Sequence, residues 1–267
     1  KYLNMSPRAS LEYSFTTLFL WQEQYNMEFC IDDGFLFIRS GGNKKMYLFP
    51  IGRGDLEMAV RKIAESGEAF YSLTEKQVEF LKGMYPDKYT FYEARDMGDY
   101  IYKTEDLAYL KGKKFRAKRN HINRFISENE DWSYEEITKD NIGEIVKMHD
   151  EWCALAENEK GLKEETVAVK KALQNYFELA FSGGLIRTKG KVVAFSVGDR
   201  LSSDTFLVHI EKAFSEYSGA YQMINCEFVK NNCMDYEFVN REDDAGNEGL
   251  RKAKISYRPY CIVKKYI

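Results

Sequence analysis

Short runs of β-branched and aromatic residues, separated by polar turns, fill the first part of the chain and are typical of strands. Helical spacing of apolar residues then follows Asp55, a probable N-cap, and a capping-box pair, Thr74 and Gln77, marks a second helix start. The pattern predicts strands over 27–31, 34–38, 45–49, 69–73 and 89–92, with helices beginning after residues 55 and 74.

The last part of the chain repeats this order of antiparallel strands, helix, strand, helix, strand. Two further helices are expected before it, over 141–156 and 164–181. The predicted strands are 185–188, 192–197, 205–210, 236–239 and 260–263, and the predicted helices are 218–230 and 248–255. The repeat predicts an α+β fold of two tandem domains, each a mixed, mostly antiparallel sheet flanked by helices. We expect domains over 1–105 and 131–267, joined by a basic connecting helix over 106–130.

Composition excludes several classes of protein. The 267 residues hold 39 Lys and Arg against 42 acids, a net charge of −3, which argues against a protein wholly dedicated to nucleic acid. Five scattered cysteines and three histidines favour reduced thiols and no metal site. No apolar run approaches the roughly 20 residues of a membrane span, and the start shows no signal peptide. We therefore expect a cytoplasmic protein, or one peripheral to the membrane.

The segment from Lys111 to Arg124 is densely basic and contains no acid. Phe115, Ile122 and Ile126 would form its apolar stripe on a helix. Unpaired cations at this density suit phosphate, so tRNA, coenzyme A phosphates or anionic lipid headgroups would all fit. The alternative is a solvated helix face. The candidate polyanion-binding residues are Lys113, Lys114, Arg116, Lys118 and Arg119.

A polar run follows the predicted strand 236–239 directly. Glu242 and Asp244 could accept a proton from an attacking amine or anchor an ammonium group, with Asn240 beside them. Arg251 and Lys254, one helical turn apart, could hold phosphate or carboxylate. We expect these residues to border a single cleft. The alternative is a polar turn and a helix cap at Asn247.

Alternation along 206–211 places Leu207, His209 and Glu211 on one face of a strand. His209 is a candidate base and Glu211 a candidate substrate-binding residue, whereas a strand histidine can also be merely hydrogen-bonded. Tyr257 is a candidate general acid.

This element order is that of the GCN5-related N-acyltransferase fold, in which two strands splay apart around the donor. The signature loop of that fold has a glycine at a helix start, where Gly219 stands here as a candidate substrate-binding residue. The loop lacks the usual leading Gln or Arg, and Tyr221 replaces the second small residue. This departure weakens acetyl-CoA as the donor.

Three stretches, 106–125, 217–225 and 239–259, resemble bacterial proteins related to the C-terminal domain of phosphatidylglycerol lysyltransferase. The third stretch, from Val239 to Pro259, is the most specific. The resemblance implies a tandem acyltransferase fold, and members of that family move an amino acid from aminoacyl-tRNA to a lipid.

We therefore expect transfer of an acyl or aminoacyl group to an amine or hydroxyl, with no tightly bound cofactor and with aminoacyl-tRNA or acyl-CoA as donor. The alternatives are an acyl-CoA-dependent N-acetyltransferase and a non-catalytic RNA- or phospholipid-binding module of the same fold.

Overall fold

The computed structural model describes residues 1–6, 10–41, 44–155 and 161–267. The chain divides into two compact units. The first unit contains Lys1–Tyr100, Asp243–Lys252 and Cys261–Ile267, and the second contains Ile101–Glu242 and Ala253–Tyr260. The predicted boundaries did not include this exchange of segments near the C-terminus.

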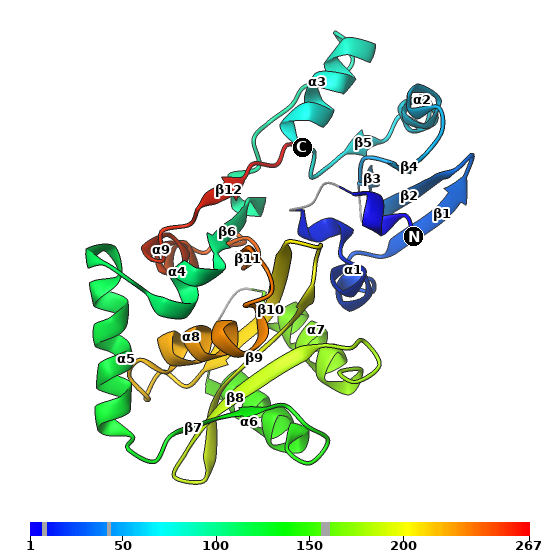
Figure 1. Cartoon of the computed structure of the whole chain (residues 1–267). Coiled ribbons are helices and arrows are strands. Elements are labelled where there is room, and N and C mark those ends of the chain that lie inside the picture. The colour runs from blue at the N-terminus through cyan, green and yellow to red at the C-terminus, as the bar shows by residue number, and fades with distance from the viewer. Residues whose placement is uncertain (7–9, 42–43, 156–160) are drawn as a thin grey trace. The chain divides into compact units, whose positions relative to one another are not determined.

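The first unit is built on a small mixed sheet. β2 pairs antiparallel with β1, β3 and β4, and β3 pairs parallel with β5. Its elements in chain order are α1 (Phe15–Trp21), β1 (Met27–Asp32), β2 (Phe35–Ser40), β3 (Met46–Tyr47), β4 (Ile51–Gly52), α2 (Leu56–Ser66), β5 (Ala69–Phe70) and α3 (Glu75–Met84) (Figure 1).

Local sequence signals set most of these boundaries. The Asp55 side chain accepts a hydrogen bond from Met58 N at 3.0 Å, and Thr74 and Gln77 form the predicted capping box at α3. Asp33 and Gly34, at φ of 45° and 82°, make the tight turn of the β1–β2 hairpin. Buried side chains from the sheet, α2 and α3 then form one core, among them Phe35, Phe37, Val60, Ile63, Leu73 and Leu81.

The second unit contains a larger sheet. Its strands follow the order β6-β11-β10-β9-β8-β7, where only β10 and β11 are parallel. Its elements in chain order are β6 (Asp99–Lys103), α4 (Thr104–Tyr109), α5 (Arg116–Glu128), β7 (Ser133–Glu136), α6 (Ile142–Leu155), α7 (Leu162–Gln174), β8 (Ser182–Thr188), β9 (Lys191–Arg200), β10 (Thr205–Ala213), α8 (Ala220–Asn232) and β11 (Phe238–Asn240). The boundary between the units falls within β6 and within α9 (Glu248–Ser256), and β12 (Cys261–Val263) belongs to the first unit.

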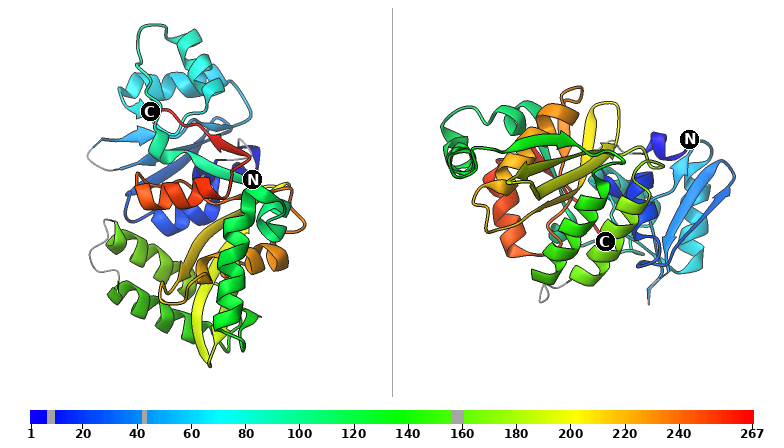
Figure 2. Two further views of the ribbon diagram at one scale, coloured as in Figure 1. Left: turned by 90° about the vertical axis from the view of Figure 1, so that its left-hand side faces the viewer. Right: turned by 90° about the horizontal axis from the view of Figure 1, so that it is seen from below.

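Helices cover both faces of this sheet, with α6 and α7 side by side on one of them (Figure 2). Neighbouring residues of β10 show the two layers: Glu211 contacts Asn225 of α8, whereas Lys212 contacts Glu165 of α7. This alternation follows from the pleat of a strand.

Part of the predicted repeat of pattern is present in both units. In each, an antiparallel strand leads through a helix to a parallel neighbour, β3–α2–β5 in the first unit and β10–α8–β11 in the second. The fold class, α+β with mixed sheets flanked by helices, is confirmed.

Several predictions about elements were wrong. The helix predicted over 164–181 ends at Gln174. The elements α1 and β4 were not predicted. Residues 89–92 form no strand, because Tyr89 and Phe91 pack on the core of α2 and α3 while Tyr92 hydrogen-bonds Ile267. β6 and β7 were missed. The basic segment is not one helix, because Leu110 and Gly112 adopt positive φ and end α4 before a 3₁₀ turn, Lys113–Phe115, leads into α5.

The two halves of the sequence exchange their last extended segments. β6 lies next to β11 in the second unit, whereas residues 265–267 hydrogen-bond Leu73, Tyr92 and Ala94 in the first. A buried ammonium group helps to hold residues 265–267 in the first unit. Lys265 Nζ donates to Glu12 at 2.6 Å and to Asp99 at 2.5 Å.

Candidate active site

The parallel pair β10–β11 opens partway along its length. Its pairing runs from Thr205–Phe238 to Leu207–Asn240 and stops there, although β10 continues to Ala213. A bulge in the β9–β10 register falls at His209, where the opening begins. Along the rest of β10, in the described part of the chain, no residue of β11 occupies that edge of the ladder. This open edge of β10 stands where the splayed pair of the fold is expected.

The turn after β11 aims Glu242 at this opening. Asn240 is buried, and its side chain accepts a hydrogen bond from Glu242 N at 2.7 Å. Glu242 has φ of 55°, an uncommon conformation for a residue with a side chain. Its carboxylate is a quarter exposed and approaches His209 Nδ1 at 3.0 Å. The local turn therefore places one carboxylate at this opening.

His209 has both ring nitrogens engaged. Nε2 lies 3.0 Å from Asp199 and Nδ1 lies 3.0 Å from Glu242, and the side chain is 3% exposed. Burial lowers the pKa of His209, but the hydrogen bonds to the two carboxylates outweigh it and raise the pKa to about 9. An imidazolium ion with two carboxylate partners is not a base at neutral pH, so the predicted base role does not fit this geometry.

Glu211 lies at the centre of a second group of polar side chains in the second unit. One of its oxygens accepts from Arg241 Nη2 at 2.8 Å and the other from Asn225 Nδ2 at 2.9 Å. The guanidinium of Arg241 lies over the ring of Tyr257, 4.8 Å from its centroid, and Lys118 Nζ lies 3.9 Å from the same centroid. Burial raises the pKa of Tyr257, which keeps its hydroxyl protonated and makes it a weaker proton donor than a free tyrosine.

Lys254 reaches the same group, since its Nζ donates to the carbonyl of Arg241 at 2.5 Å. The structure thus brings together four predicted residues, Glu211, Tyr257, Lys254 and Lys118. Sequence reasoning missed Arg241 and Asn225. Arg241 lies inside the polar run already singled out, but Asn225 in mid-helix carries no recognisable sequence signal.

Asp244 and Arg251 form a separate group in the first unit. Asp244 is fully buried and accepts from Arg251 Nε at 2.9 Å, Arg251 Nη2 at 2.8 Å and Tyr100 Oη at 2.6 Å. Burial raises the pKa of Asp244, but these hydrogen bonds lower it to about 2. Arg251 also donates to Asp96 at 2.6 Å. Asp244 therefore has the environment of a structural carboxylate, and the predicted role as proton acceptor does not fit this geometry.

The helix-cap alternative holds for the residues that follow, because Asn247 accepts a hydrogen bond from Leu250 N at 3.0 Å.

Gly219 has a packing role at the start of α8. It adopts φ of 89°, and a Cβ there would lie 2.1 Å from the carbonyl oxygen of His121 in α5. α5 thus lies against the helix start at which a pyrophosphate was expected, and the binding role of Gly219 stays a prediction.

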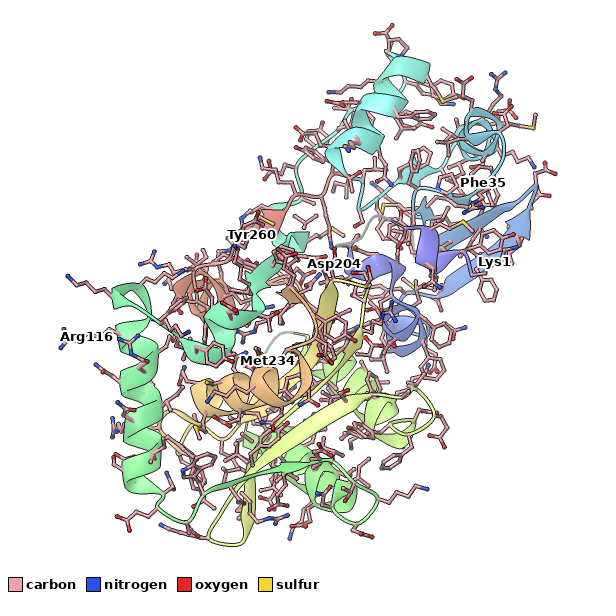
Figure 3. The ribbon with its side chains drawn as sticks, in the orientation of Figure 1. Lys1, Phe35, Arg116, Asp204, Met234 and Tyr260 are labelled. Atoms are coloured by element: carbon pink, nitrogen blue, oxygen red, sulfur yellow. The ribbon has the colours of Figure 1, made fainter. Side chains whose placement is uncertain are left out.

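The basic segment divides into buried, paired and exposed cations. Lys118 is buried, Arg119 donates to the carbonyls of Leu110 and Gly112, and Lys114 pairs with Asp106 at 2.8 Å. Lys113 and Arg116 are exposed, and Arg116 points away from α5 (Figure 3). The predicted apolar stripe is only partly right, since Phe115 is buried and Ile122 is half-buried but Ile126 is exposed, and Phe125, which was not predicted, is buried instead.

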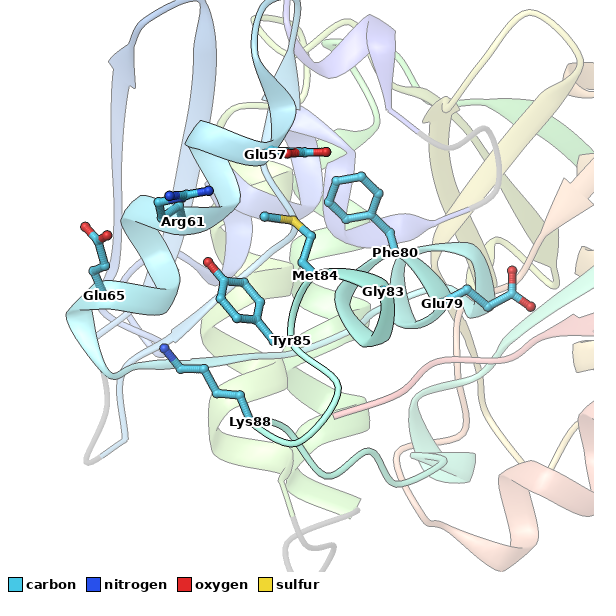
Figure 4. Close-up of a pocket in the computed structure, with 9 residues that line it drawn as sticks. All are labelled: Glu57, Arg61, Glu65, Glu79, Phe80, Gly83, Met84, Tyr85 and Lys88. Atoms are coloured by element: carbon cyan, nitrogen blue, oxygen red, sulfur yellow. The ribbon is translucent and has the colours of Figure 1, made fainter.

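A groove of about 670 Å³ lies in the first unit between α2 and α3 (Figure 4). Arg61 and two glutamates of α2 face Phe80, Met84 and Tyr85 across it. None of the predicted site residues lines this groove, so it does not belong to the candidate site.

Comparison with known proteins agrees with this fold. The profile of the family described as phosphatidylglycerol lysyltransferase, C-terminal, matches residues 4–267. A crystal structure of a conserved protein of unknown function from Bacteroides thetaiotaomicron is 39% identical, with a TM-score of 0.93, over 99% of this chain and 93% of that one.

More distant structures share the fold. L-PGS from Bacillus licheniformis is 16% identical with a TM-score of 0.60, over 95% of this chain and 90% of that one. FemX is 7% identical with a TM-score of 0.64, over 99% and 94%. An uncharacterized protein of Mycoplasmoides gallisepticum is 26% identical over 200 residues, which are 73% of this chain and 62% of that protein. The chain thus spans under two thirds of this curated relative.

Among the described residues, no helix has both the length and the apolar character that crossing a membrane requires.

Proposed function

We propose, on the premise that this chain belongs to the phosphatidylglycerol lysyltransferase C-terminal family, that it transfers an acyl or aminoacyl group from an activated donor to an amine or hydroxyl. The observation that carries the proposal is the edge of β10 that β11 leaves open beyond Leu207, with Glu242 held just after the end of β11. Such a reaction needs an oriented nucleophile, a proton acceptor and donors for the developing oxyanion. The open edge of β10 offers backbone N–H groups as oxyanion donors.

Glu242 is the candidate proton acceptor. One of its oxygens is bound to His209, and the side chain is partly exposed, whereas both oxygens of Glu211 are engaged by buried partners. The imidazolium fixes the carboxylate in place through its bonds to Asp199 and Glu242. As the acceptor nitrogen or oxygen attacks the donor carbonyl, its proton passes to Glu242, and Tyr257 is the candidate acid for the leaving group.

Aminoacyl-tRNA is the donor we favour. The glycine at the start of α8 packs against α5, and the loop before it departs from the pyrophosphate-binding signature. Exposed Lys113 and Arg116 suit RNA phosphates, or anionic lipid headgroups if the acceptor is a lipid. An acyl-CoA donor would find fewer of its expected contacts.

A transfer assay with two donors tests the proposal. The purified chain is incubated with labelled aminoacyl-tRNA or with labelled acetyl-CoA, and the label is followed into lipid and into water-soluble amines. We expect transfer from aminoacyl-tRNA, lost in Glu242→Gln and kept in Glu178→Gln, an exposed residue of the same unit. Transfer from acetyl-CoA alone would support the N-acetyltransferase alternative. Binding of RNA or vesicles without transfer from either donor would identify a non-catalytic module.

A further inference from the structure

The group around Glu211 carries more positive charge than its own carboxylate can balance. Arg241 and Lys118 both lie against the ring of Tyr257, and Glu211 is the acid that pairs with the guanidinium. The side chains of Arg241 and Glu211 are only 11% and 13% exposed. Burial and the charge of Arg241 together lower the pKa of Lys118 to about 8, which shows how closely the two cations act on each other.

Among the described residues, two buried polar atoms of this group find no hydrogen-bond partner. They are Nη1 of Arg241, a donor, and Oδ1 of Asn225, an acceptor. Rotating the Asn225 amide would not help, because its nitrogen donates to Glu211 and a carboxylate cannot accept from a carbonyl oxygen. Buried polar atoms in native proteins are nearly always paired, and an unpaired one costs about 1–3 kcal/mol. The two atoms belong to residues on opposite oxygens of the same carboxylate.

We infer that Arg241, Lys118 and Asn225 form a subsite for a free amino acid, which is bound by its carboxylate and its neighbouring ammonium group. The carboxylate accepts from Arg241 Nη1 and from the Lys118 ammonium, and the ligand ammonium donates to Asn225 Oδ1 beside the charge of Glu211. Both unpaired atoms gain a partner, and charge-assisted bonds of this kind are the strong ones. An inorganic phosphate would meet the cations, but it has no ammonium group to donate to Asn225 Oδ1 or to offset its negative charge next to Glu211.

One consequence of this inference rests on the proposed function, namely that a small amino acid serves as an acceptor in the transfer. The binding itself is independent of transfer. It can therefore be measured on the resting protein with no donor present.

Calorimetric titration of the full chain with four probes tests the inference. The probes are L-alanine, L-alaninamide, N-acetyl-L-alanine and inorganic phosphate. We expect L-alanine to bind at least tenfold more tightly than the other three, since each of these lacks the carboxylate, the ammonium group or both. Equal binding of alanine and alaninamide, tighter binding of phosphate, or no binding of alanine would overturn the inference.

Variants locate the site. Lys118→Met should weaken alanine binding about tenfold, and Lys147→Met, an exposed lysine on α6, should leave it unchanged. Asn225→Leu should remove the preference for alanine over N-acetyl-alanine. Arg241→Met leaves Glu211 buried without its cation and can fail to fold. Lys118→Met is therefore the deciding variant. An unchanged affinity in folded Lys118→Met would contradict the assignment.

The two proposals fail separately. Alanine binding without transfer from either donor would leave the subsite in place and refute the transferase. Transfer to other acceptors without alanine binding would support the transferase and refute the subsite.

Discussion

Two groups of buried charges in this protein differ in how completely they are paired. In the first unit, Asp244 accepts hydrogen bonds from Arg251, Tyr100 and the backbone of Gly246. In the second unit, Arg241 and Asn225 share Glu211, and each keeps one polar atom for which the described part of the chain supplies no partner. A fully paired buried carboxylate holds elements together, whereas an incompletely paired group retains the capacity to bind. Residue type alone does not distinguish the two, because both groups contain an arginine, an acid and a tyrosine.

Removing the charge of Asp244 should have the largest effect on stability. Asp244→Asn leaves Arg251 and Arg95 without their buried partner, and we expect a loss of about 3 kcal/mol in the free energy of unfolding. Urea denaturation measures the loss. Asp243→Asn is the matched control, because it keeps the bond to Ala245 N and should cost far less.

The low pKa of Asp244 also determines the direction in which stability changes with pH. A carboxylate whose pKa falls to about 2 on folding stabilises the native state above its unfolded pKa, and this contribution disappears as the pH falls toward 2. If Asp244→Asn had the same stability as the native chain at neutral pH, the group would not be the structural one described.

His209 should give the opposite dependence. Its pKa rises from 6.5 to about 9 on folding, so its contribution of up to about 3 kcal/mol is fully present below pH 6.5 and is lost as the pH rises through 9. Unfolding free energies measured between pH 6 and 10 should fall in the native chain and flatten in His209→Gln. Exposed His121→Gln is the control, and a flat profile in the native chain would mean that His209 is neutral.

Glu242→Gln tests whether the Glu242 carboxylate, one oxygen of which is bound to His209, is functional. It keeps the shape of the side chain and an oxygen for His209, so we expect turnover to fall by roughly 10²-fold while the unfolding free energy changes by about 1 kcal/mol or less. Initial rates and urea denaturation of the same preparation measure both. A large loss of stability with full activity per folded molecule would place Glu242 with Asp244 as a structural residue.

The smallest effect is expected on the surface of the basic segment. Replacing Lys113, Lys114 and Arg116 with Gln should weaken tRNA binding several-fold and flatten its dependence on salt, because fewer counterions are released. Lys118→Gln should leave the salt dependence unchanged, since its ammonium lies against Tyr257. Equal salt slopes in the native chain and the triple variant would return the segment to a solvated helix face. Parallel titrations with anionic vesicles show which polyanion is preferred.

The sequence determined features that depend on near neighbours along the chain. The Asp55 cap, the Thr74–Gln77 box and the repeated order of strand, helix and parallel strand follow from local hydrogen bonds and from side-chain periodicity. The family resemblance added the correct fold. The polar run after β11 was found for the same reason, because polar residues that interrupt apolar spacing stand out.

Only the tertiary structure decided which polar residues have partners. Asp244 bonds Tyr100, which lies 144 positions away, and Lys265 bonds Glu12, which lies 253 positions away. The exchange of β6 and the C-terminal segment between the units also depends on such distant pairings. Asn225 lies in mid-helix and matters only because β10 places Glu211 opposite it. The sequence does not distinguish a buried charged group whose hydrogen bonds are all formed from one that still has an unpaired donor or acceptor. The difference lies in the geometry of residues that folding brings together.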